Sequence, residues 1–350
     1  MTFLLREVKR RDLPSVVELA DTFSLLNLPP DERIINEKIE SSYKSFRGAS
    51  ASMEESEYFF VVEDVEKKKV VGTSLIMAKH GTEEFPHTYF DVGKKEKYSK
   101  ELGIGFIHQT LKLSYDSDGP TEIGGLLVDD HYRGRPEKLG KQISLIRFLY
   151  MSMHPQKFES RILCELTPPL SPDGRSEFWE ALGRKFTGLP YVEADYLSRQ
   201  NKEFIKNLFP EEEIYTCILD ARARYVIGRV GLSTMPAKHL LETIGFKYLN
   251  QIDPFDGGPH YGAKLNEIVL VKKAKKFEVS GQGTGEKSER LGQFDTLALV
   301  GLDHTDGFRG CLTYFDIKDK KIVLPESTKA LLDITSGDHV TLTPISEGSL

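Results

Sequence analysis

The sequence predicts a mixed α/β fold, because helical and strand-like patterns alternate along most of its length. A strand-like segment at 2–8 precedes two segments in which apolar residues recur at helical spacing. Residues 57–65 and 70–79 flank a lysine-rich turn, which is the pattern of a β-hairpin. A strand, a helix and a further strand are then expected over 122–166, so neither an all-α nor an all-β fold fits.

The other expected elements follow from the same periodicity. Strands are expected at 111–115, 122–128, 161–166 and 247–252, and helices at 138–153, 192–200, 203–208 and 236–243. The segment 81–109 has no pattern that assigns it.

Composition excludes several classes of protein. The 350 residues are 39% hydrophobic and 29% charged, which is ordinary for a globular protein with a real core. A net charge of -6 argues against nucleic-acid binding, because neutralising phosphates needs an excess of Lys and Arg. No apolar run has transmembrane length, and the N-terminus lacks a signal-peptide pattern. We therefore expect a cytoplasmic protein with neither nucleic acid nor membrane as a partner.

The three cysteines are Cys164, Cys217 and Cys311. Their odd number and wide spacing form neither a disulfide framework nor a zinc pattern, so buried thiols and no metal site are expected.

A change in composition divides the chain. Residues 276–293 are dominated by Gly, Ser, Lys and Glu and are expected to form a linker or loop. They separate a large domain at 1–275 from a small β-rich C-terminal module at 294–350. Strands of this module are expected at 294–300, 311–317, 321–324 and 339–343.

Two motifs are the most informative part of the chain. Residues 176–186, SEFWEALGRKF, predict an amphipathic helix that ends at Gly183 and leads into a strand. Residues 255–259, FDGGP, predict a turn, because glycine adopts backbone conformations that other residues resist. Taken singly, they describe a core helix and a tight turn.

Together the two motifs resemble the arginine N-succinyltransferase family, which transfers a succinyl group from succinyl-CoA to the α-amine of arginine. The resemblance covers about residues 1–272. Further matches, in order, lie at 58–64, 72–74, 147–151, 194–195, 201–205, 214–215 and 226–228. The resemblance implies an acyl-CoA N-acyltransferase (GNAT-like) fold and assembly into a homo- or hetero-oligomer. It also implies an arginine-like amine substrate and succinyl-CoA or another acyl-CoA as cosubstrate, with no permanently bound cofactor.

The segment after the strand at 122–128 is the expected site for the CoA diphosphate. A helix start presents unpaired N–H groups and partial positive charge, and Arg133, Arg135 and Lys138 add cationic donors. The loop is not the usual glycine-rich one, since Lys138 stands where the family tends to have glycine and Gly140 remains. A solvated basic loop is the alternative.

Leu126, on the strand before this loop, matches the family leucine that contacts succinyl-CoA. Its structural alternative is a leucine of the core.

The residue to which the family assigns proton donation is missing. The segment VIGRVGLSTMPA has Gly231 and Leu232 where family members have a His-Pro pair. Because glycine has no proton to donate, another residue must act or the substrate or role must differ.

Three residues are candidates for proton transfer. Glu165, at a strand end, can deprotonate the amine through water, or it can be an acid paired with Arg or Lys. Tyr215 can donate to the leaving thiolate, or it lies at the edge of the core. His239 follows the missing histidine on a helix, or it is an exposed helix histidine.

Asp256, Gly257 and Gly258 are the expected substrate-binding turn. The five-donor guanidinium of an arginine-like substrate matches carboxylates, so Asp256 and Asp253 are its candidate partners. The alternative is turn chemistry, in which an Asp before Gly binds its own backbone.

The leading hypothesis is a CoA-dependent N-acyltransferase related to arginine N-succinyltransferase. Gly231 leaves open a non-catalytic relative that acts as a binding or partner subunit. The loop Leu26-Asn27-Leu28-Pro29, which replaces the family's Thr-Ser-Leu-Pro, leaves open a different amine substrate.

Overall fold

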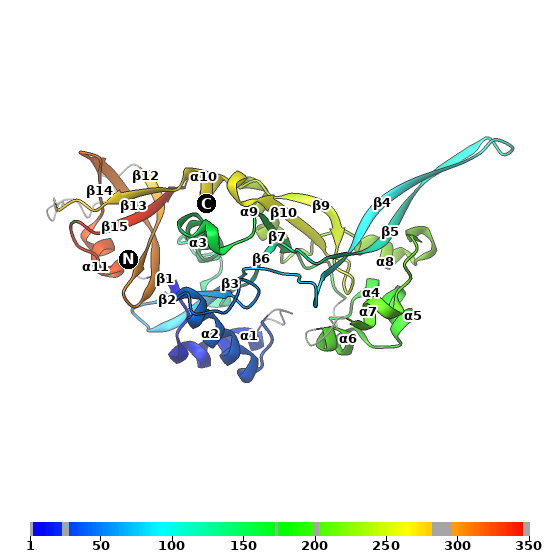
Figure 1. Ribbon diagram of the computed structural model, residues 1–350, viewed down its shortest axis with the longest axis horizontal. Helices are drawn as coiled ribbons and strands as arrows, with labels where there is room; N and C mark the ends of the chain where they lie inside the picture. The colour runs from blue at the N-terminus through cyan, green and yellow to red at the C-terminus, as the bar shows by residue number, and fades with distance from the viewer. Residues whose placement is uncertain (1–2, 23–27, 172–173, 199–202, 282–295, 346–350) are drawn as a thin grey trace. The chain divides into compact units, whose positions relative to one another are not determined.

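The computed structural model describes residues 3–22, 28–171, 174–198, 203–281 and 296–345. The chain forms two compact units, which are described separately. Unit 1 comprises Met1–Lys79, Thr121–Ser160 and Lys264–Leu350, and unit 2 comprises His80–Pro120 and Arg161–Ala263. Both units combine strands with helices (Figure 1), so the mixed α/β prediction is confirmed.

Unit 1 contains an antiparallel sheet with the strand order β11-β15-β12-β13-β1-β2-β3-β6, and β14 pairs with β13. Its strands are β1 Phe3–Glu7, β2 Glu57–Asp64, β3 Lys69–Met77, β6 Thr121–Val128, β11 Lys275–Glu278, β12 Thr296–His304, β13 Gly307–Lys318, β14 Lys321–Val323 and β15 His339–Pro344. Its α-helices are α1 Leu13–Thr22, α2 Glu32–Phe46, α3 Leu139–Met153, α10 Val269–Lys273 and α11 Glu326–Leu332. Short 3-10 turns lie at Arg10–Asp12, Asp130–Tyr132, Pro155–Lys157 and Leu265–Glu267.

Helices cover both faces of this sheet, and the alternation of side chains along β2 explains how. Phe59 and Val61 point into the core cluster that α1 and α2 complete. The intervening Phe60 points the other way, and its ring lies 5.4 Å from that of Tyr150 on α3. Figure 1 shows α1 and α2 on one side of β2 and β3, with α3 on the other. A strand buried on both faces therefore reads as the continuous apolar run seen in the sequence.

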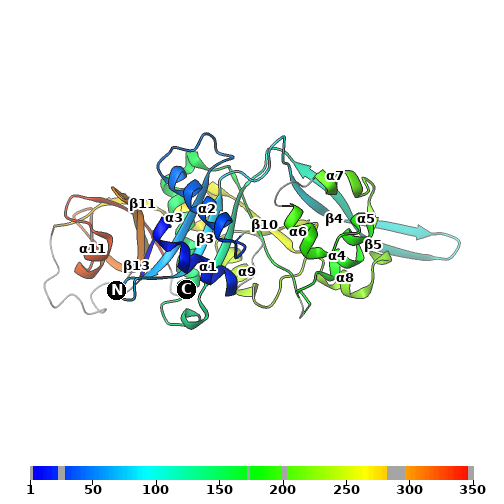
Figure 2. The ribbon, with the colours of Figure 1, turned by 90° about the horizontal axis from the view of Figure 1, so that it is seen from below.

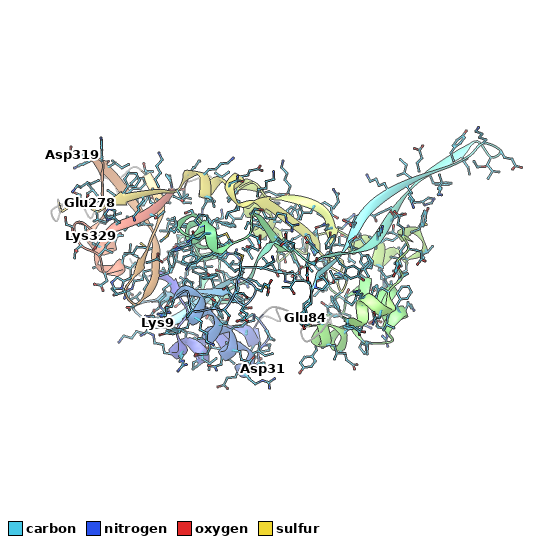
Figure 3. The ribbon with its side chains drawn as sticks, viewed as in Figure 1. Lys9, Asp31, Glu84, Glu278, Asp319 and Lys329 are labelled. Atoms are coloured by element: carbon cyan, nitrogen blue, oxygen red, sulfur yellow. The ribbon has the colours of Figure 1, made fainter. Side chains whose placement is uncertain are left out.

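Helix α2 begins where the sequence places it. Asp31 (Figure 3) is its N-cap, and its Oδ1 accepts hydrogen bonds from the N–H groups of Arg33 at 2.9 Å and Ile34 at 3.1 Å.

The C-terminal strands do not form a unit of their own. In β13, Gly310 pairs with Leu5 of β1, so the residues expected as a separate module at 294–350 continue the sheet of unit 1. The expected linker at 276–293 begins inside β11, where Glu278 (Figure 3) pairs with His339 of β15. Its remainder from 282 lies outside the described residues. The compact units thus follow strand pairing rather than the change in composition.

Unit 2 contains strands in the order β7-β10-β9-β4-β5-β8. They are β4 His87–Ser99, β5 Ile104–Asp116, β7 Arg161–Glu165, β8 Ile214–Tyr215, β9 Lys247–Ile252 and β10 Pro259–Lys264. The unassigned segment 81–109 therefore holds β4 and part of β5. These two strands form a long hairpin that extends past the helices of unit 2 (Figures 1 and 2).

The helices of unit 2 are α4 Glu177–Ala181, α5 Gly183–Thr187, α6 Tyr191–Ser198, α7 Glu203–Leu208, α8 Ala221–Val226 and α9 Met235–Thr243, with a 3-10 turn at Thr216–Ile218. The two sequence motifs pack against each other here. Ser176 Oγ accepts the Trp179 N–H at 3.0 Å and donates to the Phe255 carbonyl at 2.9 Å. The rings of Trp179 and Phe255 are stacked, with centroids 5.1 Å apart.

The strand expected after Gly183 is wrong, because residues 183–187 form helix α5. A Cβ on Gly183 would lie 2.2 Å from a ring carbon of Trp179, so this glycine makes room for the indole. The left-handed residue that ends α5 is Gly188, with φ of 71°.

Two further expectations concern cysteines and membranes. Cys164 and Cys311 are buried as expected, whereas Cys217 is exposed; all three are described, and none is in a disulfide. Among the described residues, no helix combines the length and apolarity needed to cross a bilayer.

Candidate active site

In unit 1, strand β6 contains a bulge beside the expected cosubstrate site. Ser74 of β3 lies opposite two residues of β6, Gly125 and Leu126, because the register shifts at this point. Gly125 has φ of 57°, and a Cβ on it would lie 2.5 Å from a carbon of Leu75. Leu126 is half-buried, as a residue that both packs and contacts a ligand would be.

Buried donors hold the bulge in place. Thr73 Oγ1 donates to the Gly125 carbonyl at 2.9 Å, and Arg147 Nη1 donates to the Gly124 carbonyl at 3.2 Å. Arg147 is only 2% exposed. Sequence reasoning missed its role, although the signal was present as an arginine inside an apolar helix at 147–151.

The start of α3 explains the departure at Lys138. This residue is the N-cap of α3 and has φ of 52°, in the left-handed region that glycine adopts without strain. Its carbonyl accepts the N–H groups of Lys141 and Gln142 at 2.9 and 3.2 Å. By contrast, a Cβ on Gly140 would lie 3.7 Å from Val128, an ordinary contact. The conformational need for glycine therefore falls at 138, where this chain has lysine.

The cations of this loop also support its structure. Arg133 Nε donates to the Val128 carbonyl at 3.0 Å, and Arg135 lies over the Tyr132 ring at 4.4 Å. Burial and then the nearby Lys138 charge lower the pKa of Lys141. The helix start thus combines N–H groups, two arginines and two lysines, which is an arrangement suited to an anion.

In unit 2, three segments far apart in the sequence meet next to Glu165. The Leu166 N–H donates to the Pro259 carbonyl at 3.1 Å, and the Gly231 N–H donates to the Thr167 carbonyl at 2.9 Å. A Cβ on Gly258 would lie 2.5 Å from the Leu166 carbonyl oxygen. The end of β7, the segment with the missing histidine and the FDGGP turn therefore form one site.

Imidazoles surround Glu165. His260 Nε2 lies 3.5 Å and His87 Nδ1 lies 3.9 Å from Glu165 Oε1. His80 and Asp253 each offer a further atom to groups whose members lie within 4.8 Å of one another. His260 is fully buried and His87 is 3% exposed, whereas the Glu165 side chain is 30% exposed. Glu165 is therefore the member of this group that solvent reaches.

The sequence gave no direct signal for these histidines, because they come from three separate segments. The hint was that His260 directly follows the FDGGP turn.

The FDGGP turn has the Asp chemistry that was weighed as the alternative to substrate binding. Asp253 Oδ1 accepts the N–H groups of Phe255 at 2.7 Å and Asp256 at 3.0 Å, and Asp256 Oδ1 accepts that of Gly258 at 2.7 Å. Gly257 has φ of 76°, so the expected conformational freedom is used.

Asp256 is nevertheless an unusual turn residue, because it is only 5% exposed. Burial raises its pKa well above the ordinary value, and the neighbouring charges of Asp253, Glu165 and Asp195 raise it further. Acidic groups thus converge at this turn.

Two predicted catalytic residues lie elsewhere in unit 2. On β5, Thr110 pairs with Tyr215 and Asp116 pairs with His87. Six residues of strand separate the two pairs, or roughly 20 Å. Tyr215 is therefore distant from the imidazole group, and His239 is exposed on α9. The Leu26-Asn27 pair lies outside the described residues.

The local structure at Gly231 does not accommodate the family histidine. Gly231 is buried, and a Cβ on it would lie 2.8 Å from the Pro168 carbonyl oxygen. This segment is folded for a glycine.

A mixed sheet with a bulged strand, followed by a helix start that suits an anion, defines the class of acyl-CoA N-acyltransferases. Within that class, the chain belongs to the arginine N-succinyltransferase family: the family model described as arginine N-succinyltransferase beta subunit matches residues 3–270.

Relatives agree with this assignment. The chain is 35% identical over 341 residues to an arginine N-succinyltransferase of Yersinia pestis, with 96% of each chain covered. It is 33% identical over 342 residues to one of Citrobacter koseri, with 97% of this chain and 96% of that one covered. Among solved structures, the arginine/ornithine succinyltransferase subunit AI of Pseudomonas aeruginosa matches with a TM-score of 0.83 and 26% identity, with 99% of each chain covered.

Proposed function

We propose that this protein transfers a succinyl group from succinyl-CoA to the α-amine of arginine. The observation that carries the proposal is membership of the arginine N-succinyltransferase family across nearly the whole chain. The alternative of a non-catalytic relative loses its motivation at Gly231, because a carboxylate and imidazoles lie next to that position.

The proposed CoA site is the start of α3. The diphosphate would bind the N–H groups of this helix, with Arg133, Arg135 and Lys138 as cationic partners and Gly140 in the first turn. Leu126, next to the bulge in β6, would contact the acyl group. Acyl-CoA enters as a cosubstrate that is consumed in each turnover.

The proposed proton acceptor is Glu165. The α-ammonium of arginine must lose a proton before its nitrogen can attack the thioester carbon, and Glu165 is a solvent-reached carboxylate at a strand end. Its partners at 3.5 and 3.9 Å, His260 and His87, can stabilise or relay that proton. The C–N bond then forms, the C–S bond breaks, and a proton returns to the CoA thiolate. Imidazoles from β4 and β10 would thus replace the histidine missing at 231.

The proposed substrate contact is the acidic turn at 256–258. Asp256 is buried beside the charges of Asp253 and Asp195, and a guanidinium would offset this excess of negative charge. The glycines at 257 and 258 keep side chains out of the space next to Asp256.

We also propose that the protein works in the cytoplasm as part of a homo- or hetero-oligomer. The family model is described as a beta subunit, and the Pseudomonas structure is of a subunit. The β4–β5 hairpin carries exposed Leu102, Phe106 and Ile107, and such apolar patches mark interaction surfaces. Light scattering would test this: a single-chain mass at working concentration would contradict it.

The experiment that tests the function uses the purified, tag-free protein with succinyl-CoA and arginine, and measures release of CoA thiol. We expect thiol release that requires both substrates. Acetyl-CoA, ornithine and agmatine, which lacks the carboxylate of arginine, serve as comparison substrates. No thiol release with any acyl-CoA and amine pair would overturn the proposal, and a preference for ornithine would correct the amine.

A further inference from the structure

The group around Glu165 has a composition that acyl transfer alone does not require. His80, His87 and Glu165 each offer one ligand atom, and all three atoms lie within 4.8 Å of one another. A second group, Glu165, Asp253 and His260, shares the same carboxylate. A single general base needs one partner, whereas here three imidazoles converge on one carboxylate.

The donor atoms suit a transition metal. Zinc and its neighbours take imidazole nitrogen and carboxylate oxygen at about 2.0–2.2 Å, which places tetrahedral ligand atoms about 3.3 Å apart. The separation between His87 Nδ1 and Glu165 Oε1 is 3.9 Å, and that between His260 Nε2 and Glu165 Oε1 is 3.5 Å. Small side-chain rotations bring such atoms to the required spacing. Magnesium and calcium prefer all-oxygen sites and fit less well.

The backbone holds these side chains firmly. His87 is the first residue of β4 and is paired with Asp116 of β5. His80 is fixed through its backbone, because its N–H donates to the Pro120 carbonyl at 2.7 Å. Glu165 ends β7, a short strand that neighbours β10. Ligands on rigid elements lose little freedom when they bind an ion.

Access and charge are also favourable. The histidine rings are buried on one side of the group, and the Glu165 side chain is 30% exposed on the other. Asp253 belongs to the neighbouring group, so its carboxylate adds negative charge close to the position of the ion.

We propose that His80, His87 and Glu165 bind one divalent transition-metal ion of the zinc class, with His260 next to the shared carboxylate. The ion would occupy the lone pairs of Glu165. If Glu165 is the proton acceptor of the proposed function, on which this second clause rests, the ion inhibits acyl transfer and competes with arginine.

The test titrates Co²⁺ into tag-free protein that has been stripped with a chelator, and records the visible d–d absorption of the metal. The background carries Cys217→Ser, because the exposed Cys217 thiol is a separate metal ligand. We expect one Co²⁺ per chain, with an intense band typical of four-coordinate nitrogen and oxygen ligation, and displacement of Co²⁺ by Zn²⁺. His87→Gln and His80→Asn should each weaken binding at least tenfold.

His339→Asn is the matched control, since His339 is exposed on β15 in unit 1, and it should leave Co²⁺ binding unchanged. Circular dichroism establishes that each variant is folded. His80 is the less buried of the two histidines, so His80→Asn keeps the test decisive if His87→Gln does not fold. Binding that is weaker than stoichiometric, or that survives both substitutions, overturns the proposal.

Activity is read separately, so the two proposals fail in different ways. Stoichiometric Co²⁺ binding without thiol release in the metal-free protein refutes the proposed function and leaves the metal site. Thiol release without Co²⁺ binding does the reverse. If both hold, Zn²⁺ should raise the apparent KM for arginine.

Discussion

Replacing Gly231 with histidine tests whether this chain has lost an acid or has been rebuilt without one. A Cβ at this position would lie 2.8 Å from the Pro168 carbonyl oxygen and 3.3 Å from that of Thr167. Both contacts are backbone atoms, and the Gly231 N–H is bound to the Thr167 carbonyl at 2.9 Å. The segment therefore cannot relieve the clash by a side-chain rotation.

Overpacking of this kind costs about 1–3 kcal/mol of unfolding free energy. Each kcal/mol lowers Tm by about 2–4 °C in a protein unit of 150–250 residues, so a fall of roughly 3–10 °C is expected. Turnover should stay the same or decrease, because the imidazoles beside Glu165 already lie at the site.

The assay combines thermal unfolding with CoA thiol release. Gly231→Ala carries the same Cβ without the ring and should lose a similar amount of stability, whereas Leu232→Ala, at a residue 93% exposed, should lose little. A Gly231→His protein that is as stable as the wild type and faster in turnover would refute this reasoning.

Three further outcomes are expected. Glu165→Gln should lower kcat by about 10²- to 10⁴-fold with little change in the KM for succinyl-CoA, as measured by thiol release; an unchanged kcat rules out the assigned role. Asp256→Asn keeps an acceptor for the Gly258 N–H. Because the pKa of Asp256 is raised in the fold, wild-type stability falls as pH rises from about 3.9, the unfolded value, through the raised pKa. The variant should therefore gain in Tm relative to wild type across that range, while its KM for arginine rises; an equal gain at pH 3 would contradict this account. Lys138→Gly relieves a left-handed lysine and should raise the free energy of unfolding by up to about 1 kcal/mol, whereas Lys141→Gly, inside α3, should lower it by about 1 kcal/mol in the same denaturant titration.

Local patterns were enough for much of the fold. Periodicity placed α2, α3, α7 and the β2–β3 hairpin, because each buries a regular set of apolar side chains. It failed at 81–109, since the β4–β5 hairpin is largely exposed and has no apolar alternation toward its tip. Composition misjudged the C-terminus for a different reason: pairing between β1 and β13 joins residues about 300 positions apart, and no local window contains both.

The site was predictable in part. Glu165, Gly231 and the FDGGP turn were all singled out, and the structure brings them together. Tyr215 was assigned by chemistry alone, and strand register places it away from the others. The histidines at 80, 87 and 260 could not be found from spacing, because only strand pairing collects them around one carboxylate.

The measurement that tests the central claim most directly is identification of the product by tandem mass spectrometry after incubation with succinyl-CoA and arginine. We expect arginine that carries one succinyl group on its α-nitrogen, formed in equal amount to the CoA released. Unmodified arginine, or acylation on the guanidinium, would contradict the assignment of this chain as an enzyme that acylates the α-amine.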